Sequence, residues 1–177
     1  KLLRGEHVGL VGANGEGKST FLNIVTGHLL PDEGKVEWPG RVTVGYLDQQ
    51  STLEAGKTIR EVLRTAFNDM YEAEKQMLEL YDKMAEAAPE EIDKMMNTVG
   101  EIQTELEHSG FYSLDTKIEE VANGLGLGSI GLDRDVSELS GGQRSKVLLT
   151  KLLLQNSSIL LLDEPTNYLD VEHLSLI

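Results

Sequence analysis

The sequence contains no cysteine, has no long apolar run and is poor in basic residues. Without cysteine, the 177-residue chain cannot form a disulfide, use a thiolate nucleophile or build a cysteine-based zinc site. A reducing cytoplasm fits this composition, and we expect a cytoplasmic protein. Because crossing a bilayer takes about 20 consecutive apolar residues, we expect no direct membrane insertion. The chain starts with neither an initiator Met nor a secretory leader, which predicts a piece of a longer protein.

The 16 Lys and Arg residues are outnumbered by 30 Asp and Glu residues. Affinity for a phosphate backbone is built from clustered Lys and Arg, so the net charge of −14 argues against a broad nucleic-acid-binding face. The negative charge is concentrated in residues 69–108, which hold twelve acidic and three basic residues. The middle of the chain is therefore a separate compositional unit.

The first third of the chain has the pattern of strand, loop and helix. Residues 7–11 form a short apolar run with strand character, and a glycine-rich loop and a segment with helical spacing follow it. Two short β-like pieces at 35–38 and 41–47 then predict a small antiparallel element.

The last third continues the pattern. Asp115 is predicted to be the N-cap of a helix to about residue 123, Ser140 opens a helix to about residue 155, and residues 158–163 are predicted to form a strand buried on both faces. This order of elements predicts an α/β fold with a parallel sheet and helices packed on it.

Apolar residues in the middle of the chain follow a heptad repeat. Two seams, separated by a break with Pro89 at the start of the second helix, predict an antiparallel coiled-coil hairpin that extends a helical subdomain. The hairpin tip at residues 86–94 has four acidic residues and one Lys. The predicted seams consist of Ile59, Leu63, Ala66, Met70, Ala73, Met77, Leu80 and Met84, followed by Ile92, Met96, Val99, Ile102 and Leu106.

Residues 12–19 match the pattern G-x-x-x-x-G-K-[ST] between a predicted strand and a predicted helix. Glycines let the backbone curl so that N–H groups face a β-phosphate, and the helix N-terminus adds partial positive charge. Lys18 would place its ammonium between the β- and γ-phosphates, and Ser19 its hydroxyl on Mg²⁺. The residues expected to bind ATP here are Gly12, Asn14, Gly15, Gly17, Lys18, Ser19 and Thr20.

Two further motifs carry chemistry. The apolar strand 158–162 ends in Asp163 and Glu164, and such a strand end opens on the ligand crevice of a parallel sheet. Asp163 would hold Mg²⁺ through water, and Glu164 would activate the attacking water. The second motif places a hydroxyl and bare amides at a helix N-terminus, which makes a second anion site. It consists of Ser140, Gly141, Gly142 and Gln143.

These three motifs, in this order, resemble those of the ATP-binding cassette ATPases, and the resemblance covers nearly the whole chain outside the hairpin. It implies a P-loop NTPase fold in which residues 139–143 are the signature loop, contacting an ATP held by a second cassette. Gln49 is similar to the Q-loop residue of the family, a ligand at the nucleotide and its metal, with Gln50 as the alternative register. Asp170 would be the D-loop residue that touches the partner cassette.

Two features resemble the ABC-F branch, cytosolic tandem-cassette proteins of which many act on the ribosome. Residues 166–170 are similar to the usual T-N-H-L-D and depart from it at Tyr168, and the hairpin resembles the arm of a first cassette. We therefore predict an ATPase whose partners are a second cassette, either of the same full-length chain or of a second copy in a homodimer, and the ribosome. An rRNA-reading tip should be basic, so the acidic tip predicts that the arm touches protein or approaches RNA with other surfaces.

The alternatives belong to other classes. The ATP-binding subunit of a transporter would need a compact helical subdomain with a groove for a coupling helix, and a heptad hairpin would be superfluous there. A chromosome-maintenance cassette would carry a far longer coiled coil, and an excision-repair cassette would need cysteines for zinc.

The sequence predicts three units. Residues 1–57 are the N-terminal part of the ATP-binding core, residues 58–110 the helical arm, and residues 111–177 the signature helix, the acidic strand end and the D-loop. In the family, the adenine-stacking aromatic residue precedes the first motif and the switch histidine lies beyond the D-loop. We expect the chain on its own to bind nucleotide weakly and to turn it over negligibly.

Overall fold

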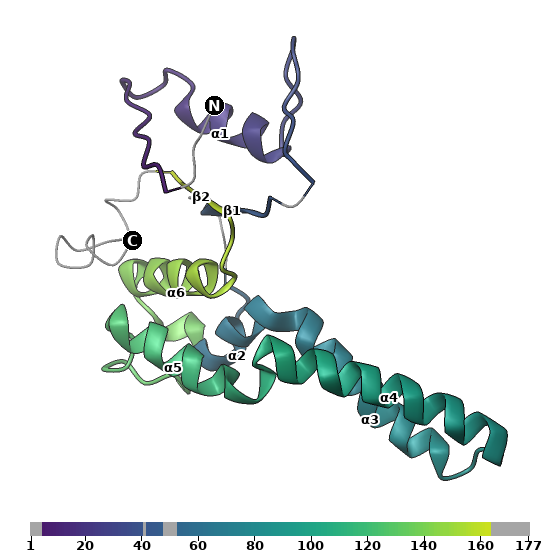
Figure 1. Cartoon of the computed structure of the whole chain (residues 1–177). Coiled ribbons are helices and arrows are strands. Elements are labelled where there is room, and N and C mark those ends of the chain that lie inside the picture. Colours follow the sequence, from purple (N-terminus) through teal and green to yellow (C-terminus); the bar gives the residue numbers. More distant parts are fainter. Residues whose placement is uncertain (1–4, 41, 48–52, 164–177) are drawn as a thin grey trace.

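The computed structural model describes residues 5–40, 42–47 and 53–163 (Figure 1). The helices are α1 (Lys18–Thr26), α2 (Ile59–Arg64), α3 (Asn68–Met84), α4 (Pro89–Ser109), α5 (Leu114–Gly124) and α6 (Gly141–Leu154), the strands are β1 (Val44–Leu47) and β2 (Ile159–Leu162), and short 3-10 turns lie at η1 (Thr65–Phe67), η2 (Phe111–Ser113) and η3 (Val136–Glu138). The expectations that lie outside the described part concern Gln49, Gln50, Glu164 and residues 165–170.

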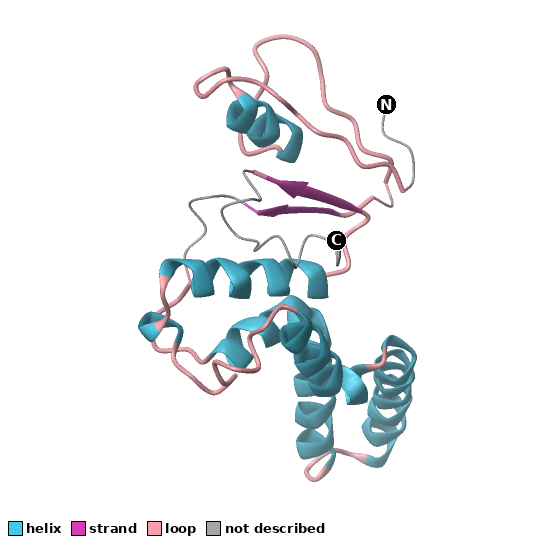
Figure 2. Ribbon diagram, turned by 90° about the vertical axis from the view of Figure 1, so that its left-hand side faces the viewer, coloured by secondary structure: helices cyan, strands magenta, loops and turns pink. Residues whose placement is uncertain are grey.

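The two strands pair in parallel, with Val44 opposite Ile159 and Leu47 opposite Leu162. Both views place this small sheet between α1 on one side and α6 on the other (Figures 1 and 2). A β-carbon at Gly45 would lie 2.8 Å from Leu152 of α6, so glycine allows the close approach of helix and strand. Because the strands run in the same direction, their carboxyl ends lie at one edge of the sheet.

A parallel sheet is present, as expected, but three predictions about its strands are wrong for the described residues. Residues 7–11 and 35–38 form no strand, and the strand within 41–47 pairs in parallel with β2, not in an antiparallel element. Residues 159–162 are half-buried where burial on both faces was expected. A strand forms only where a neighbour takes up its N–H and C=O groups, and an apolar run by itself does not specify that neighbour.

The main core lies in the helical half of the molecule. It is built from side chains of several elements that are distant in sequence, so α2, α4, α5 and α6 are held as one body. Its most completely buried members are Ile59, Leu63, Leu106, Ile118, Ala122, Leu127, Val136, Val147 and Leu154.

Helices α3 and α4 lie side by side and protrude from this core as a hairpin (Figure 1). Pro89 is the first residue of α4, as predicted, since its missing N–H costs nothing in a first turn. Met96 was assigned to the seam, but it is 54% exposed, whereas Met95 is half-buried. Steps of three and four residues from Ile92 through Met95 to Val99 keep the buried stripe on one face.

Two helix boundaries differ from the sequence predictions. The predicted seam from Ile59 to Met84 is interrupted at Phe67, whose φ of −123° is not helical and whose ring is buried in the core. The second difference is at Asp115, which lies in the first turn of α5 while Ser113 occupies the N-cap position. The Asp115 carboxylate instead forms an ion pair with Arg64, so it does not cap the helix.

Candidate functional site

The glycine-rich loop before α1 has the backbone that a phosphate-binding loop requires. Gly15 and Gly17 both have φ of 87°, a left-handed conformation that residues with a β-carbon adopt only at a cost. Gly17 is also the N-cap of α1, and it has no side chain to bond the amides of the first turn. Those amides, from Lys18 to Thr20, are therefore placed to bind an anion at the helix N-terminus.

Side chains of the loop fold back onto its own backbone. The Lys18 Nζ atom donates to the carbonyl oxygens of Gly12 and Ala13, both at 2.9 Å. The Ala13 N–H donates to Glu16 Oε2 at 2.8 Å. Lys18 thus holds its ammonium against the loop, while Ser19 at the start of α1 is exposed. Asn14, predicted to contact nucleotide, is exposed in the same turn.

Asp163 lies directly after β2, and only 4% of its surface is exposed. Its N–H donates to the carbonyl oxygen of Leu47 at 3.4 Å, which ties it to the carboxyl end of β1. A carboxylate at this edge of a parallel sheet is an oxygen ligand of the kind that Mg²⁺ prefers.

The signature loop is stabilised by a capping box at the start of α6. Gln143 N–H donates to Ser140 Oγ at 3.3 Å, and Ser140 N–H donates to Gln143 Oε1 at 3.0 Å. Ser140 as the helix start is confirmed, and Gln143, predicted as a nucleotide contact, has its carbonyl oxygen committed to the cap. Ser140, Gly141 and Gly142 are exposed, so the loop presents its hydroxyl and amides at the surface.

The chain leading into the signature loop is clamped to the start of α2. Ile59 N–H donates to the carbonyl of Arg134 at 3.0 Å, and Val136 N–H donates to that of Lys57 at 2.9 Å. Thr58 and Asp135 form an isolated antiparallel bridge between these segments. The base of the arm and the start of the signature loop are therefore parts of one rigid unit.

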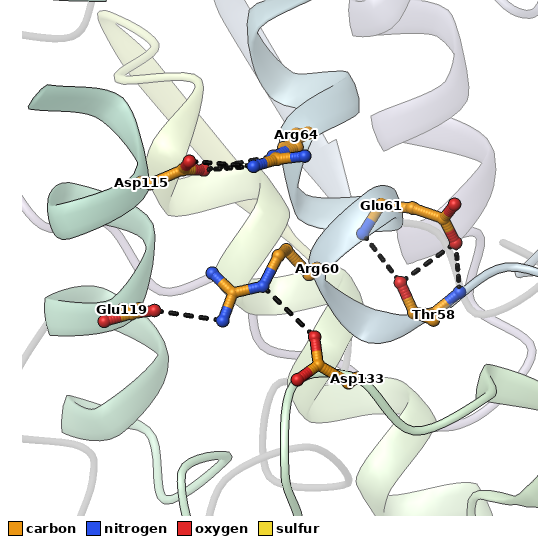
Figure 3. A network of polar contacts seen from close by, with 7 residues as sticks. All are labelled: Thr58, Arg60, Glu61, Arg64, Asp115, Glu119 and Asp133. Carbon is orange, nitrogen blue, oxygen red and sulfur yellow. Dashed lines mark hydrogen bonds and ion pairs between the residues drawn. The ribbon is translucent and has the colours of Figure 1, made fainter. Parts of the chain in front are cut away.

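Ion pairs also join α2 to α5 and to the segment that leads into the signature loop (Figure 3). Arg60 donates to Glu119 at 2.9 Å and to Asp133 at 3.3 Å. Arg64 donates to both carboxylate oxygens of Asp115, at 2.9 and 2.7 Å. Sequence reasoning missed these pairs, because the partners lie 51 to 73 residues apart and no local pattern links them.

Hydrogen bonds shift the pKa of several groups in this network. Hydrogen bonds from Arg64 hold the pKa of Asp115 below its usual value, and those to Glu119 raise the pKa of Arg60. The pKa of Glu61 is lowered because the backbone N–H of Thr58 donates to its carboxylate in a capping box. The Thr-x-x-Glu pattern was the one sequence signal that could have located this helix start.

Within the part of the chain that is described, no hydrogen bond or ion pair joins the 12–20 loop to Asp163 or to the signature loop. The loop residues nevertheless fit a polyphosphate, since they combine N-terminal amides with an ammonium group. Ser19 and Asp163 carry oxygen atoms of the kind that Mg²⁺ prefers. Among the described residues, no three His, Cys, Asp or Glu side chains are grouped so that they could hold a metal ion by themselves.

The parallel strands, the glycine loop ahead of a helix and the acidic strand end define a nucleotide-binding α/β domain of the P-loop type. A family model described as ABC transporter matches residues 1–167. The chain belongs to this family and is an ATP-binding cassette. None of the described helices combines the length and the apolar character that a membrane crossing requires.

Several known proteins are similar to the chain. An uncharacterized ABC transporter ATP-binding protein, YfmM of Bacillus subtilis, is 62% identical over 174 residues, which are 98% of this chain and 34% of that protein. Energy-dependent translational throttle protein EttA of Mycobacterium tuberculosis is 38% identical over 169 residues, covering 95% of this chain and 29% of that protein. The chain thus spans about a third of the length of each of these relatives.

A solved structure has a similar fold. It is the complex of archaeal ribosomal stalk protein aP1 and the archaeal ribosome recycling factor aABCE1, with a TM-score of 0.53 and 31% sequence identity. The match covers 92% of this chain and 23% of that one.

Proposed function

We propose that the chain is part of the first cassette of a cytoplasmic two-cassette ABC-F protein, which binds and hydrolyses ATP with Mg²⁺ and acts on the ribosome. The observation that carries this proposal is the protruding α3–α4 hairpin, inserted between β1 and the signature helix α6. We take it as the coiled-coil arm, spanning residues 58–110 between the core parts 1–57 and 111–177. A rigid arm lets a cassette contact a partner far from its nucleotide.

The proposed nucleotide chemistry gives a role to each of several single groups. Lys18 and the amides of the first turn of α1 would bind the β- and γ-phosphates, and Ser19 and Asp163 would orient the metal together with Gln49. Bound Mg²⁺ neutralises charge on the phosphates. Glu164 would accept the proton of the attacking water.

A second cassette is part of the proposal. The signature residues 140–143 lie at the surface at the start of α6 and have no hydrogen bond to the chain's own phosphate loop. Such a loop is suited to the γ-phosphate of an ATP bound by another cassette. On this basis the isolated chain would hydrolyse ATP negligibly, because one half of the composite site comes from elsewhere.

The ribosomal role is supported by similarity to EttA, whose name describes a translational throttle. The acidic arm, with twelve acidic and three basic residues in 69–108, would be repelled by an RNA backbone along most of its surface. The proposal therefore has the arm contact protein, or RNA through a limited face.

A transporter role is the second candidate. It is favoured by the family to which the chain belongs, whose model carries the description ABC transporter. In that case the chain would be the ATP-binding subunit of a complex with a separate membrane-spanning partner, and the α3–α4 hairpin would have no role in coupling.

Co-sedimentation with purified ribosomes distinguishes the ABC-F role from the transporter role. The full-length protein with Glu164→Gln should trap the ATP state and pellet with ribosomes in ATP but not in ADP. The double variant Lys18→Ala/Glu164→Gln is the matched control and should remain in the supernatant. Failure of the Glu164→Gln protein to pellet in ATP, although it retains bound ATP, would remove the ABC-F function.

A further inference from the structure

Residue 16 of the phosphate-binding loop is a glutamate, and its carboxylate is folded onto the loop. Oε2 accepts the Ala13 N–H at 2.8 Å. The contact is close, since a β-carbon at Gly12 would lie 2.6 Å from the same oxygen. Glycine at position 12 therefore leaves the space that this carboxylate occupies.

The same short segment also holds Lys18. The Ala13 carbonyl accepts the Lys18 ammonium at 2.9 Å and the Glu16 N–H at 3.3 Å, and the Gly12 carbonyl accepts Lys18 at 2.9 Å. The two charged side chains of the loop, Glu16 and Lys18, are thus both hydrogen-bonded to its backbone. This arrangement is a latch formed by Glu16 and Lys18 across Gly12 and Ala13.

The pattern G-x-x-x-x-G-K-[ST] leaves position 16 open, so the phosphate chemistry does not require an acid there. The carboxylate has the same sign of charge as a phosphate, and both are attracted to amide donors and to an ammonium. Whatever anion the loop binds must work against this charge.

We propose that Glu16 is a built-in competitor of the polyphosphate, holding the loop in a latched resting form that ATP must open. The inference rests on the ATP-binding role proposed above and adds a regulatory device to that site. When ATP binds, the carboxylate leaves the Ala13 amide and turns to solvent, while the Lys18 ammonium leaves the two carbonyls for the phosphates. The affinity of the loop for polyphosphate is therefore lower than its donors alone would give.

The competition acts on phosphates and not on the base. Removing the carboxylate should tighten binding of ATP and ADP, whose β-phosphate sits in the loop, and should tighten inorganic tripolyphosphate to a similar extent. This pattern distinguishes a competitor from a residue that merely supports the local fold, whose loss would weaken all of these ligands.

The test uses the full-length protein and a fluorescent ATP analogue, displaced by ADP or by inorganic tripolyphosphate. Glu16→Ala removes the contact, and Glu16→Gln keeps the shape while removing the charge. We expect Glu16→Ala to bind the polyphosphate ligands about three- to tenfold more tightly, the range of one lost competing hydrogen bond. Glu16→Gln can still accept the Ala13 N–H, so it should bind them more tightly than the parent protein but less tightly than Glu16→Ala. Glu33→Ala and Glu33→Gln, at an exposed turn of the same lobe, make the same charge changes away from the loop and should leave affinity unchanged.

Unchanged or weaker binding of polyphosphate by Glu16→Ala would overturn the inference, provided that Lys18→Ala abolishes binding. An equal gain in the Glu33 variants would also overturn it, because the effect would then come from net charge. If Lys18→Ala binds as well as the parent protein, the ATP site itself is wrong. The two failures are therefore distinguishable.

Discussion

The two halves of the molecule are stabilised in different ways. The helical half, residues 53–155, is built around a cluster of buried side chains contributed by four helices. In the part of the chain before it, residues 5–40, helix α1 buries no residue, and Val11 and Leu30 are 94% and 90% exposed. The shape of the phosphate loop therefore comes from glycine dihedrals and local hydrogen bonds. The signature loop also has a local cap, but it is anchored to the packed core through the buried Leu139.

The largest expected effect tests this difference in stability. Leu63 in α2 is fully buried, and Leu63→Ala should lower the free energy of unfolding by about 2–5 kcal/mol through lost burial and a cavity. Leu30→Ala makes the same truncation at an exposed site and should change it by less than about 0.5 kcal/mol. Urea unfolding of the chain, followed by circular dichroism, measures both. Similar losses in the two variants would contradict the contrast between the halves.

A smaller effect is expected at the glycine that shapes the loop. Gly17→Ala forces a β-carbon into a left-handed conformation that costs about 1–2 kcal/mol, so nucleotide affinity of the full-length protein should fall about tenfold.

The matched control is Gly9→Ala, in the same lobe, where a β-carbon would meet no atom within 4 Å and no left-handed conformation is required. The measurement is nucleotide affinity with the unfolding curve recorded beside it. Equal affinity in the two variants would mean that the loop does not depend on its dihedrals.

Local signals in the sequence predicted local structure well. The glycine loop before α1, Pro89 at the start of α4 and the Ser140 cap of α6 each depend on residues within a few positions, and the structure has all three. What depends on distant residues could not be predicted. The partner of β1 is 115 residues away, and the apolar run at 7–11 pairs with no other segment that the structure describes.

In the candidate site, too, some features could be predicted from nearby residues and others could not. The spacing of the motif alone predicts the phosphate-binding residues. It does not predict the hydrogen bond from the Ala13 N–H to Glu16, because the motif does not determine which rotamer the Glu16 side chain adopts. The pairing of Arg64 with Asp115 had no signal in the sequence, and it displaced the predicted capping role of Asp115.

The smallest expected effect is the dependence of stability on pH. It bears on the comparison between the two halves because Asp115 belongs to the packed helical half. Its pKa lies below the usual 3.8 owing to Arg64, so the pair contributes stability above that value and loses it as the pH falls through the depressed folded pKa. Asp115 is half-exposed, and screening limits the contribution to about 1 kcal/mol. Asp115→Asn should therefore unfold at lower urea than the parent chain at pH 7, and the difference should shrink as the pH falls below 3.8. A difference that persists under strong acid would mean that packing around α5, and not the ion pair, accounts for the loss.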